Sequence, residues 1–460
     1  MLFIQPAYFV LLAIVLVGYW TQRNVSHRKL WLLAASYVFY SWWDWRLTGL
    51  LLLSTAIDHQ CALGIGRLPQ GHPRRKRLVL VSILGNLAIL GTFKYFDFFV
   101  QSLVDSAALI GFEADPWLLA IVLPPGISFY TFQSMAYTID VYDGRVKARR
   151  SLLDVALFVA FFPQLVAGPI LRAKQFMPQL DRRHRLADVP ISAAALLFVI
   201  GFWKKAVFAD SLALFTDPVW ASPELYDRPT LLFAAWVFHI QLFCDFSGYS
   251  DMAIASAALL GFRVPRNFAA PLLAHNLTEF WRRWNITLMQ WFRDYVYLRL
   301  PVRFRYINIV FTAVLIGLWH GAAWTFALFG LVQGLGLAAL AALRRSRLHL
   351  RVPYVAGVIL TGAFLSLANC FFRAESIDDS AYILSALAGV VPAGAQSLGA
   401  EAWAALALLV IFYLSWTALR VPWRLSRLRA GTAAAVSGVL LALACAAMPP
   451  NYQPFVYFQF

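Results

Sequence analysis

Residues 231–262 read LLFAAWVFHIQLFCDFSGYSDMAIASAALLGF, an apolar run in which Asp245 and Asp251 are the only acidic or basic residues apart from one histidine. Only an internally hydrogen-bonded backbone is stable in hydrocarbon, so about 20 consecutive apolar residues indicate a membrane-spanning helix. Hydrophobic residues make up 61% of the 460-residue chain, against roughly 45–50% in a soluble domain. The chain is therefore predicted to be an integral membrane protein.

Eleven further apolar runs lie on either side of this one. Together they predict an all-α polytopic membrane protein with about a dozen transmembrane helices in a single domain, 1–460. The first run lacks a basic leader and a small-residue cleavage site, so we expect a retained span rather than a signal peptide. The runs are 6–20, 30–43, 47–66, 78–93, 117–140, 191–209, 307–320, 323–343, 352–372, 402–419 and 431–448.

The net charge of +16 comes mainly from Lys and Arg in the segments between the apolar runs. Such clusters mark cytoplasmic loops, and their positions predict an N-terminus outside and a first loop inside. No soluble basic domain is visible, so membrane lipid is a predicted partner and nucleic acid is not. The four cysteines are far apart and lack metal-ligand spacing, so we expect small core residues and no metal site.

Two segments depart from simple spans. Residues 151–171 lie between two basic loops and contain Pro163, Gly168 and Pro169, which disfavour a continuous helix. Such a break at membrane depth is tolerated where protein or water surrounds it, and a re-entrant hairpin is therefore predicted. Residues 274–305 interleave arginines with aromatic side chains, which is typical of an interfacial helix or of a helix lining a wet cavity.

His320 is the histidine with the most unusual setting. It lies in GLWHGAAW, residues 317–324, and is 15 residues beyond the basic loop that ends at Arg305. In a helix this is about 22 Å, well into a hydrocarbon layer of about 30 Å. A titratable imidazole at that depth is costly unless it faces a cavity, where it suits general base chemistry. The residues alone leave two interpretations open, a catalyst and a buried structural donor.

The other histidines have plainer interpretations. His59 and His239 lie on apolar runs, where a single histidine more often makes a hydrogen bond between helices. His27, His72, His184 and His349 lie in basic loops and are expected to be solvated.

A second polar cluster interrupts the opening run. FCDFSGYSDMA, residues 243–253, places Asp245, Tyr249 and Asp251 among apolar side chains, with Gly248 as a potential kink. These side chains could line a substrate path, or they could form hydrogen-bonded contacts between helices.

Several enzyme classes leave characteristic motifs that this sequence lacks. No GxSxG, P-loop, GxGxxG or HExxH motif occurs, which argues against a serine hydrolase, an ATP-driven pump and a metalloprotease. A transporter without chemistry remains an alternative, because broken helices and intramembrane carboxylates also occur in transporters.

Eight stretches of the chain resemble, in family order, the membrane-bound O-acyltransferases, and most closely their bacterial alginate O-acetyltransferase branch. The WRRW and GLWHGA elements are the most specific. The stretches are ASYVFYSWWDWR (35–46), LPPGISFYTFQSMAYTIDVYDG (123–144), FFPQLVAGPI (161–170), GFWKKAVFAD (201–210), DFSGYSDMAIA (245–255), NLTEFWRRWNITLMQWFRDYVY (276–297), GLWHGAAWTF (317–326) and PFVYFQF (454–460).

The resemblance implies a fold with a tunnel through the bilayer and a catalytic histidine in that tunnel, which corresponds to His320 here. The family has a second functional position in the FWRRW element, where the alginate and teichoic-acid branches usually carry histidine. This chain has Asn285 there, 35 residues before His320. Asparagine can orient a group or donate a hydrogen bond, but it cannot act as a base.

The resemblance also implies a function. We expect an O-acetyltransferase of a bacterial inner membrane that passes acetyl groups from cytoplasmic acetyl-CoA to a secreted polysaccharide, as in alginate biosynthesis. The transfer would be direct or through a periplasmic SGNH-type partner protein. Acetyl-CoA would be a substrate, and no bound cofactor is expected. Transfer of D-alanyl or fatty-acyl groups is the alternative within the family.

Aromatic and basic residues around the two motifs have expected roles. Arginines of 282–305, including Arg282 and Arg283, would hold the donor's phosphates, because guanidinium matches phosphate geometry. A wall of four tryptophans would exclude water and so prevent hydrolysis of the thioester. These are Trp281, Trp284, Trp319 and Trp324.

Overall fold

The computed structural model describes residues 1–113, 115–346, 352–418 and 430–449. They are helical, with turns and loops and one isolated bridge between Tyr226 and Gln396. This confirms the prediction of an all-α chain. The last matching stretch, 454–460, lies outside the described residues. The chain forms two compact units, Met1–Pro190 with Ser256–Pro265, and Ile191–Ala255 with Arg266–Phe460; the prediction of a single domain stays a prediction.

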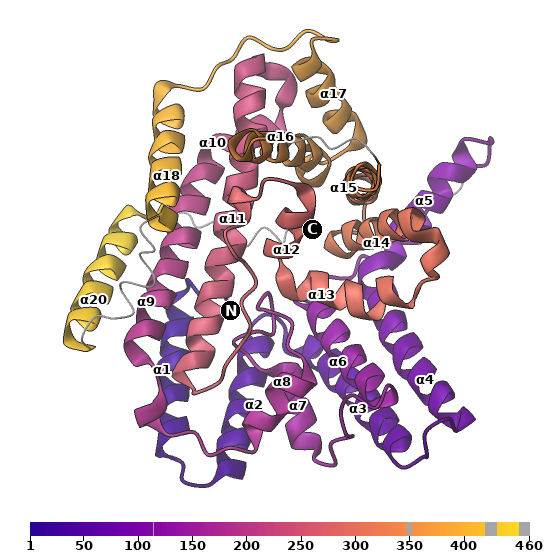
Figure 1. Cartoon of the computed structure of the whole chain (residues 1–460), viewed down its shortest axis with the longest axis vertical. Helices are drawn as coiled ribbons and strands as arrows, with labels where there is room; N and C mark the ends of the chain where they lie inside the picture. Colours follow the sequence, from indigo (N-terminus) through magenta and orange to yellow (C-terminus); the bar gives the residue numbers. More distant parts are fainter. Residues whose placement is uncertain (114, 347–351, 419–429, 450–460) are drawn as a thin grey trace. The chain divides into compact units, whose positions relative to one another are not determined.

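The first unit contains eight α-helices in the described residues. A π-helical segment, Gly91–Tyr95, joins α4 to α5 into one continuous helical stretch (Figure 1). The helices are α1 (Pro6–Thr21), α2 (Val25–Ser41), α3 (Thr48–Gly66), α4 (Pro73–Leu90), α5 (Phe96–Ala108), α6 (Ile127–Tyr142), α7 (Leu152–Ala160) and α8 (Ala173–Leu180).

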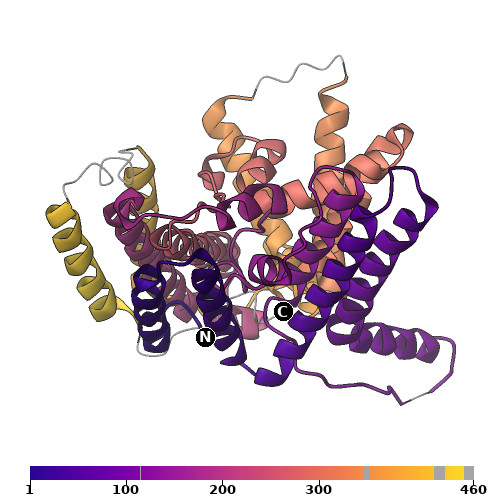
Figure 2. The ribbon, with the colours of Figure 1, turned by 90° about the horizontal axis from the view of Figure 1, so that it is seen from below.

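The helices α3, α4 and α6 pack together (Figure 2). A buried carboxylate lies between them. Asp58 of α3 accepts hydrogen bonds from Asn86 Nδ2 of α4 at 2.8 Å and from Thr138 Oγ1 of α6 at 3.0 Å. The hydroxyls of Ser82 and Ser134 also donate to it. A buried carboxylate needs such donors, and here they join the three helices.

The predicted span 117–140 starts ten residues before the helix that the structure shows. The run 117–140 is helical only from Ile127, and residues 117–123 are mostly exposed. Pro124 and Pro125 lack the N–H groups that a helix would use. Gly126 then has a left-handed φ of 71°, and a Cβ there would lie 2.7 Å from the carbonyl oxygen of Leu165. The prolines and this close backbone contact set the start of α6.

The segment 151–171 turns back on itself, and its insertion into the membrane as a re-entrant hairpin stays a prediction. The helix α7 has nine residues, about 13 Å, and the buried residues that follow it have no regular structure up to α8. Arg149, just before the segment, donates to Asp154 Oδ2 at 3.0 Å and also reaches the carbonyl oxygen of Met177 and the carboxylate of Asp181. The chain therefore enters and leaves this hairpin at the same place.

The second unit contains most of the longer helices of the described residues (Figure 1). A π-helical segment, Trp203–Ala209, joins α9 to α10. The helices are α9 (Ile191–Phe202), α10 (Asp210–Ala221), α11 (Arg228–Leu259, whose last four residues belong to the first unit), α12 (Leu277–Arg283), α13 (Ile286–Tyr295), α14 (Arg305–His320), α15 (Trp324–Leu343), α16 (Tyr354–Arg373), α17 (Ile377–Ala388), α18 (Ala400–Ala418) and α20 (Ala430–Ala447).

Seven helical stretches of the described residues are long and apolar enough to cross a bilayer. They match predicted runs in both units, which makes the chain a multi-pass membrane protein. They are Pro73–Ala108, Ile191–Ala221, Arg228–Leu259, Val302–His320, Trp324–Leu343, Tyr354–Arg373 and Ala430–Ala447.

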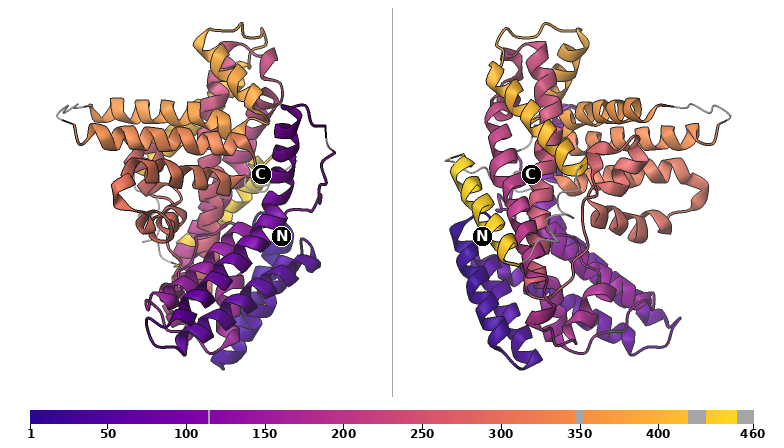
Figure 3. Two further views of the ribbon diagram at one scale, coloured as in Figure 1. Left: turned by 90° about the vertical axis from the view of Figure 1, so that its right-hand side faces the viewer. Right: turned by 60° about the vertical axis from the view of Figure 1, so that its left-hand side comes forward.

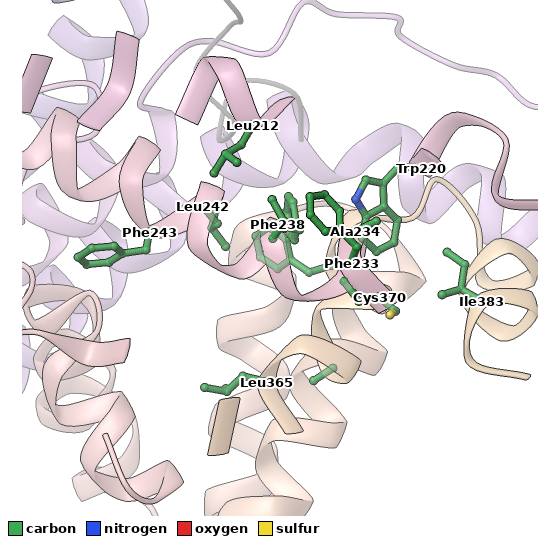
Figure 4. Close-up of a cluster of buried hydrophobic side chains, with 14 of the residues drawn as sticks. Leu212, Trp220, Phe233, Ala234, Phe238, Leu242, Phe243, Leu365, Cys370 and Ile383 are labelled. Atoms are coloured by element: carbon green, nitrogen blue, oxygen red, sulfur yellow. The ribbon is translucent and has the colours of Figure 1, made fainter. Parts of the chain in front are cut away.

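A hydrophobic cluster around α11 forms the centre of the second unit. Phe233, Phe238 and Leu242 of α11 pack with side chains of α10, α16 and α17, among them Trp220 and Ile383 (Figure 4). The thiols of Cys244 and Cys370 are free and buried there, as expected of small core residues, whereas Cys445 is exposed, so the expectation is wrong for that cysteine. The cluster holds the polar middle of α11 in a fixed position.

The helices α14 and α15 form a closely packed hairpin (Figure 3). Small residues let the two backbones approach: a Cβ at Gly334 would lie 2.7 Å from Val310 Cα, and a Cβ at Gly330 would lie 2.7 Å from Val314 Cα. Such small-residue faces are typical of helix pairs in membranes. The hairpin turns at Gly321, directly after His320.

Candidate active site around His320

His320 is the last residue of α14 and is 4% exposed. Its ring makes edge-to-face contacts with Phe372 at 5.2 Å and with Trp319 at 5.1 Å between centroids. Gly321 follows with extended backbone, and a side chain at that position would overlap the ring of Phe326. The sharp turn after α14 therefore depends on glycine and fixes the place of the imidazole.

The imidazole of His320 faces a small cavity of about 20 Å³, which has room for a group of about the size of one water molecule. The walls come from α11, α12, α14, α15 and α16 and from Trp284 beyond α12. The polar lining residues are His239, His320, Gln333, Asn369, Trp281 and Trp284, and the apolar ones are Leu242, Phe280, Phe329, Leu365 and Phe372.

Three of these polar residues were not predicted as site residues. Gln333 Oε1 accepts a hydrogen bond from Trp281 Nε1 at 3.2 Å. Asn369 Nδ2 lies 3.1 Å from His239 Nδ1. The sequence predicts a structural role for His239, because a single histidine on an apolar run more often makes a hydrogen bond between helices. The sequence does contain a feature that points to His239: it is a second titratable residue at membrane depth. Such residues are energetically costly there and mark functional sites.

Asn285 lies at a backbone break between α12 and α13. Its φ of 42° is left-handed, a conformation that asparagine tolerates better than most residues. Asn267 holds the break, because its carbonyl accepts from Ile286 N at 2.9 Å and its side chain accepts from Thr287 Oγ1 at 2.7 Å. The Asn285 side chain is buried, does not line the cavity, and its amide has no hydrogen-bond partner among the described residues.

The predicted tryptophan wall is only partly present. Trp281 and Trp284 line the cavity, and Trp319 packs on the His320 ring. Trp324, the first residue of α15, is 56% exposed, so it does not belong to this wall. The helix start places its side chain outside the packed core of the hairpin.

The predicted phosphate-binding arginines differ in availability. Arg283 donates to the carboxylate of Glu279 and to the carbonyl oxygen of Ala270, and Arg293 pairs with Asp294 at 2.8 Å. Arg282 is exposed on α12 and lies outside the cavity.

The second polar cluster of the sequence forms contacts between helical segments. Lys205 Nζ lies 2.7 Å from Asp210 and 2.8 Å from Asp245, and Lys204 Nζ lies 2.7 Å from Asp251. Tyr249 is buried on the same helix. The helix α11 is continuous through Gly248. The Gly248 and Gly201 backbones come so close that a Cβ at either would lie within 2.6 Å of the other's carbonyl oxygen.

A larger cavity of about 1000 Å³ lies in the first unit. It is strongly basic: Lys174, Arg182, Arg183, Arg185 and Arg263 line it with a single carboxylate, Asp188. None of the five cations forms an ion pair within the described part of the chain. We refer to this cavity as the basic groove.

The basic groove has a defined frame. The Gln179 side chain accepts from Arg263 N at 2.8 Å and donates to the Arg263 carbonyl at 3.0 Å. His184 is half-buried against Phe262, with 4.8 Å between ring centroids, and its Nε2 lies 3.0 Å from the Gln179 carbonyl. Burial of the ring lowers the pKa of His184. The expectation of a fully solvated His184 is therefore wrong.

Comparisons with known proteins identify relatives among membrane acyltransferases. Residues 145–365 match the model of the membrane-bound O-acyltransferase family. A probable alginate O-acetylase, AlgI, of Azotobacter vinelandii is 38% identical over 389 residues, which is 82% of this chain and 76% of that protein. The peptidoglycan O-acetyltransferase of Helicobacter pylori is 33% identical over 434 residues, 85% of this chain and 80% of that protein.

A more distant relative transfers a different group. The teichoic acid D-alanyltransferase of Streptococcus thermophilus is 31% identical over 232 residues, which is 46% of this chain and 55% of that protein.

The helical membrane fold and these relatives define an integral membrane enzyme that transfers acyl groups to hydroxyls. The chain belongs to the membrane-bound O-acyltransferase family. The resemblance read from its motifs is thereby confirmed, together with the class of enzyme.

Proposed function

We propose that this enzyme transfers acetyl groups from acetyl-CoA to hydroxyls of an exported polysaccharide, and that His320 is the general base. Both acetyl-transferring relatives match more than four-fifths of this chain, whereas the D-alanyl-transferring relative matches less than half of it. The observation that carries the proposal is the buried His320 imidazole facing a small cavity with aromatic walls.

In the proposed reaction the acceptor hydroxyl attacks the thioester carbonyl carbon. His320 takes the hydroxyl proton as the new C–O bond forms, and it returns that proton to the departing thiolate as the C–S bond breaks. General base assistance of this kind contributes roughly 10²–10⁴-fold to the rate. The aromatic walls, including Trp281 and Trp284, keep water from hydrolysing the thioester.

Asn285 has two proposed contributions. Its left-handed backbone ends α12 and so places Trp284 against the cavity. Its buried amide has no hydrogen bond to the described residues and lies outside the cavity, so it would orient a part of the donor that extends beyond that cavity.

The donor's phosphates have a candidate binding surface on the exposed part of 282–305, where Arg282 and Arg299 have exposed side chains. This segment belongs to the same compact unit as His320, and arginine binds phosphate in a bidentate manner. The basic groove belongs to the first unit and is a separate surface that suits a phosphate-bearing ligand such as a lipid headgroup.

The location and partners follow from the same proposal. The basic loops support a bacterial inner-membrane location with the N-terminus outside. Acetyl groups would then reach the polysaccharide on the outer face, directly or through a periplasmic SGNH-type partner.

The test uses the full chain in proteoliposomes with acetyl-labelled acetyl-CoA and soluble polysaccharide acceptors such as alginate and peptidoglycan fragments. We expect label in the polymer with the wild type and a loss of at least 10²-fold with His320→Ala. His59→Gln, which changes a buried histidine of the first unit, serves as the matched control. Full transfer by a folded His320→Ala protein would overturn the proposed base, and no transfer from acetyl-CoA by the wild type would overturn the proposed donor.

A further inference from the structure

His239 and His320 line the same cavity, although they are 81 positions apart in the sequence and come from different helices. His239 lies on α11 and is 6% exposed. The cavity volume is about 20 Å³, so the two imidazoles face a space that admits little more than the reacting atoms of a substrate. Among the described residues, no other histidine lines this cavity.

Three contacts fix the His239 ring. Its plane lies nearly parallel to Trp284, at 17° and 5.8 Å between centroids, and it also packs on Phe280 at 5.6 Å. Its rotation in that plane is set by the Asn369 side chain of α16, whose Nδ2 lies 3.1 Å from His239 Nδ1. A ring fixed in both tilt and rotation is pre-organised, as catalytic hydrogen-bond donors must be.

The contact with Asn369 also favours one tautomer of the His239 ring. An amide N–H that donates to Nδ1 requires a lone pair there, so the neutral ring carries its proton on Nε2. In this form His239 is a hydrogen-bond donor and not a base at Nε2. His320 and His239 would then offer complementary functions, one accepting a proton and the other stabilising negative charge.

We propose that His239 is a second catalytic residue, which donates from Nε2 to the carbonyl oxygen of the acyl group. This inference rests on the proposed acyl transfer. When the acceptor oxygen bonds to the carbonyl carbon, the carbonyl π electrons move onto oxygen while the hydroxyl proton goes to His320. The Nε2–H of His239 stabilises that oxyanion. The C–S bond then breaks, the carbonyl re-forms, and the thiolate leaves with the proton held by His320.

Asn369 acts in this scheme as a positioning residue. Its amide holds His239 in the donating tautomer and does not itself contact the reacting atoms. Removal of one oxyanion donor in other enzymes costs roughly 10²–10³-fold in kcat. Loss of Asn369 should cost less, because the ring stays stacked on Trp284 and can still adopt the donating tautomer part of the time.

The competing interpretation is that His239 and Asn369 only join α11 to α16. The two interpretations differ in the parameter that changes. A structural pair affects thermal stability and the yield of folded protein, whereas an oxyanion donor affects kcat with little change in KM or melting temperature.

The experiment compares His239→Phe with His239→Gln in the full chain in proteoliposomes. Phenylalanine keeps the stacking on Trp284 but has no donor, and glutamine keeps a donor. We expect kcat to fall roughly 10²–10³-fold in His239→Phe, to recover at least tenfold of that loss in His239→Gln, and to fall by an intermediate factor in Asn369→Leu, with KM for acetyl-CoA within threefold throughout. His59→Gln is the control for loss of a buried histidine.

Folded His239→Phe with wild-type kcat would overturn the inference, and so would equal kcat values for the phenylalanine and glutamine variants. If His239→Phe does not accumulate, Asn369→Leu decides in its place, and an unchanged kcat there overturns the tautomer argument. Failure of the proposed function looks different: His320→Ala would then transfer acetyl groups normally, or the wild type would not transfer them at all.

Discussion

Lys205 Nζ lies 2.8 Å from a carboxylate oxygen of Asp245, and both side chains are at most 3% exposed. Lys205 belongs to the π-helical segment after α9, whereas Asp245 lies in the middle of α11. Lys205 also pairs with Asp210 at 2.7 Å. A buried cation thus neutralises carboxylates from two directions, and the wider turn of the π segment brings the lysine to them.

Replacing this lysine should destabilise the second unit strongly. Lys205→Met leaves two buried carboxylates without their cation, which typically costs about 3–5 kcal/mol. Lys204→Met changes the neighbouring pair with Asp251, whose side chains are 19% and 22% exposed, and it should cost much less. Thermal unfolding of the two variants in the same detergent compares them. Equal melting temperatures would mean that the buried cation contributes nothing to stability.

The left-handed backbone of Asn285 gives a second prediction. Alanine has a Cβ but no side-chain amide, so this conformation costs roughly 1–2 kcal/mol in Asn285→Ala. Glycine has no Cβ, so Asn285→Gly avoids that cost. We expect the alanine variant to melt at lower temperature and the glycine variant to melt near the wild type. If the amide orients the donor, Asn285→Gly will nevertheless show a raised KM for acetyl-CoA. Wild-type kinetics in the glycine variant would restrict Asn285 to its backbone role.

Charge reversal can identify the surface that holds the donor's phosphates. On 282–305, Arg282→Glu with Arg299→Glu should raise the KM for acetyl-CoA about tenfold at low salt, and the difference should shrink at 0.5 M salt because of screening. Arg67→Glu with Arg74→Glu makes the same charge change on another basic segment and should have little effect. An unchanged KM in Arg282→Glu with Arg299→Glu would rule out 282–305 as the surface that holds the phosphates.

The same measurement should be made in vesicles with and without anionic lipid. If the basic groove binds lipid headgroups, Arg182→Glu with Arg183→Glu will leave the KM for acetyl-CoA unchanged and will alter activity only when anionic lipid is present.

The half-buried ring of His184 predicts a pH dependence of stability. Burial lowers the pKa of His184 in the folded protein, while the unfolded chain keeps an ordinary value of about 6.5. Protonation therefore favours the unfolded state: this contribution to stability is complete above pH 6.5 and is lost as the pH falls toward the lowered pKa. Melting temperatures measured between pH 5 and pH 8 should decline on the acidic side, and less so in His184→Gln. Parallel curves for the two proteins would contradict the prediction.

Most of the helices could be predicted because apolar runs of about 20 residues have one stable form in hydrocarbon. The predicted helix bounds are wrong where the hydrophobic pattern does not show which residues a segment will contact. The run 117–140 is apolar throughout, yet the prolines at 124 and 125 and the close contact at Gly126 delay the start of α6.

The candidate site was predictable in part for a similar reason. His320 is marked by its depth and by the small residues around it, and both are visible in the sequence. The role of His239 depends on Asn369, which is 130 positions away, and no local pattern connects them. Likewise, nothing in DFSGYSD reveals that its carboxylates face Lys204 and Lys205.

The hairpin at residues 151–171, whose two ends Arg149 joins, bears on the membrane topology of the chain. A segment that enters and leaves the bilayer on the same side does not count as a crossing. Each later helix therefore starts on the same side of the bilayer as it would if the segment were missing. Reporter proteins fused at residues 147 and 183 should therefore report the same compartment. The hairpin could also be lengthened or shortened in relatives without inverting the rest of the protein.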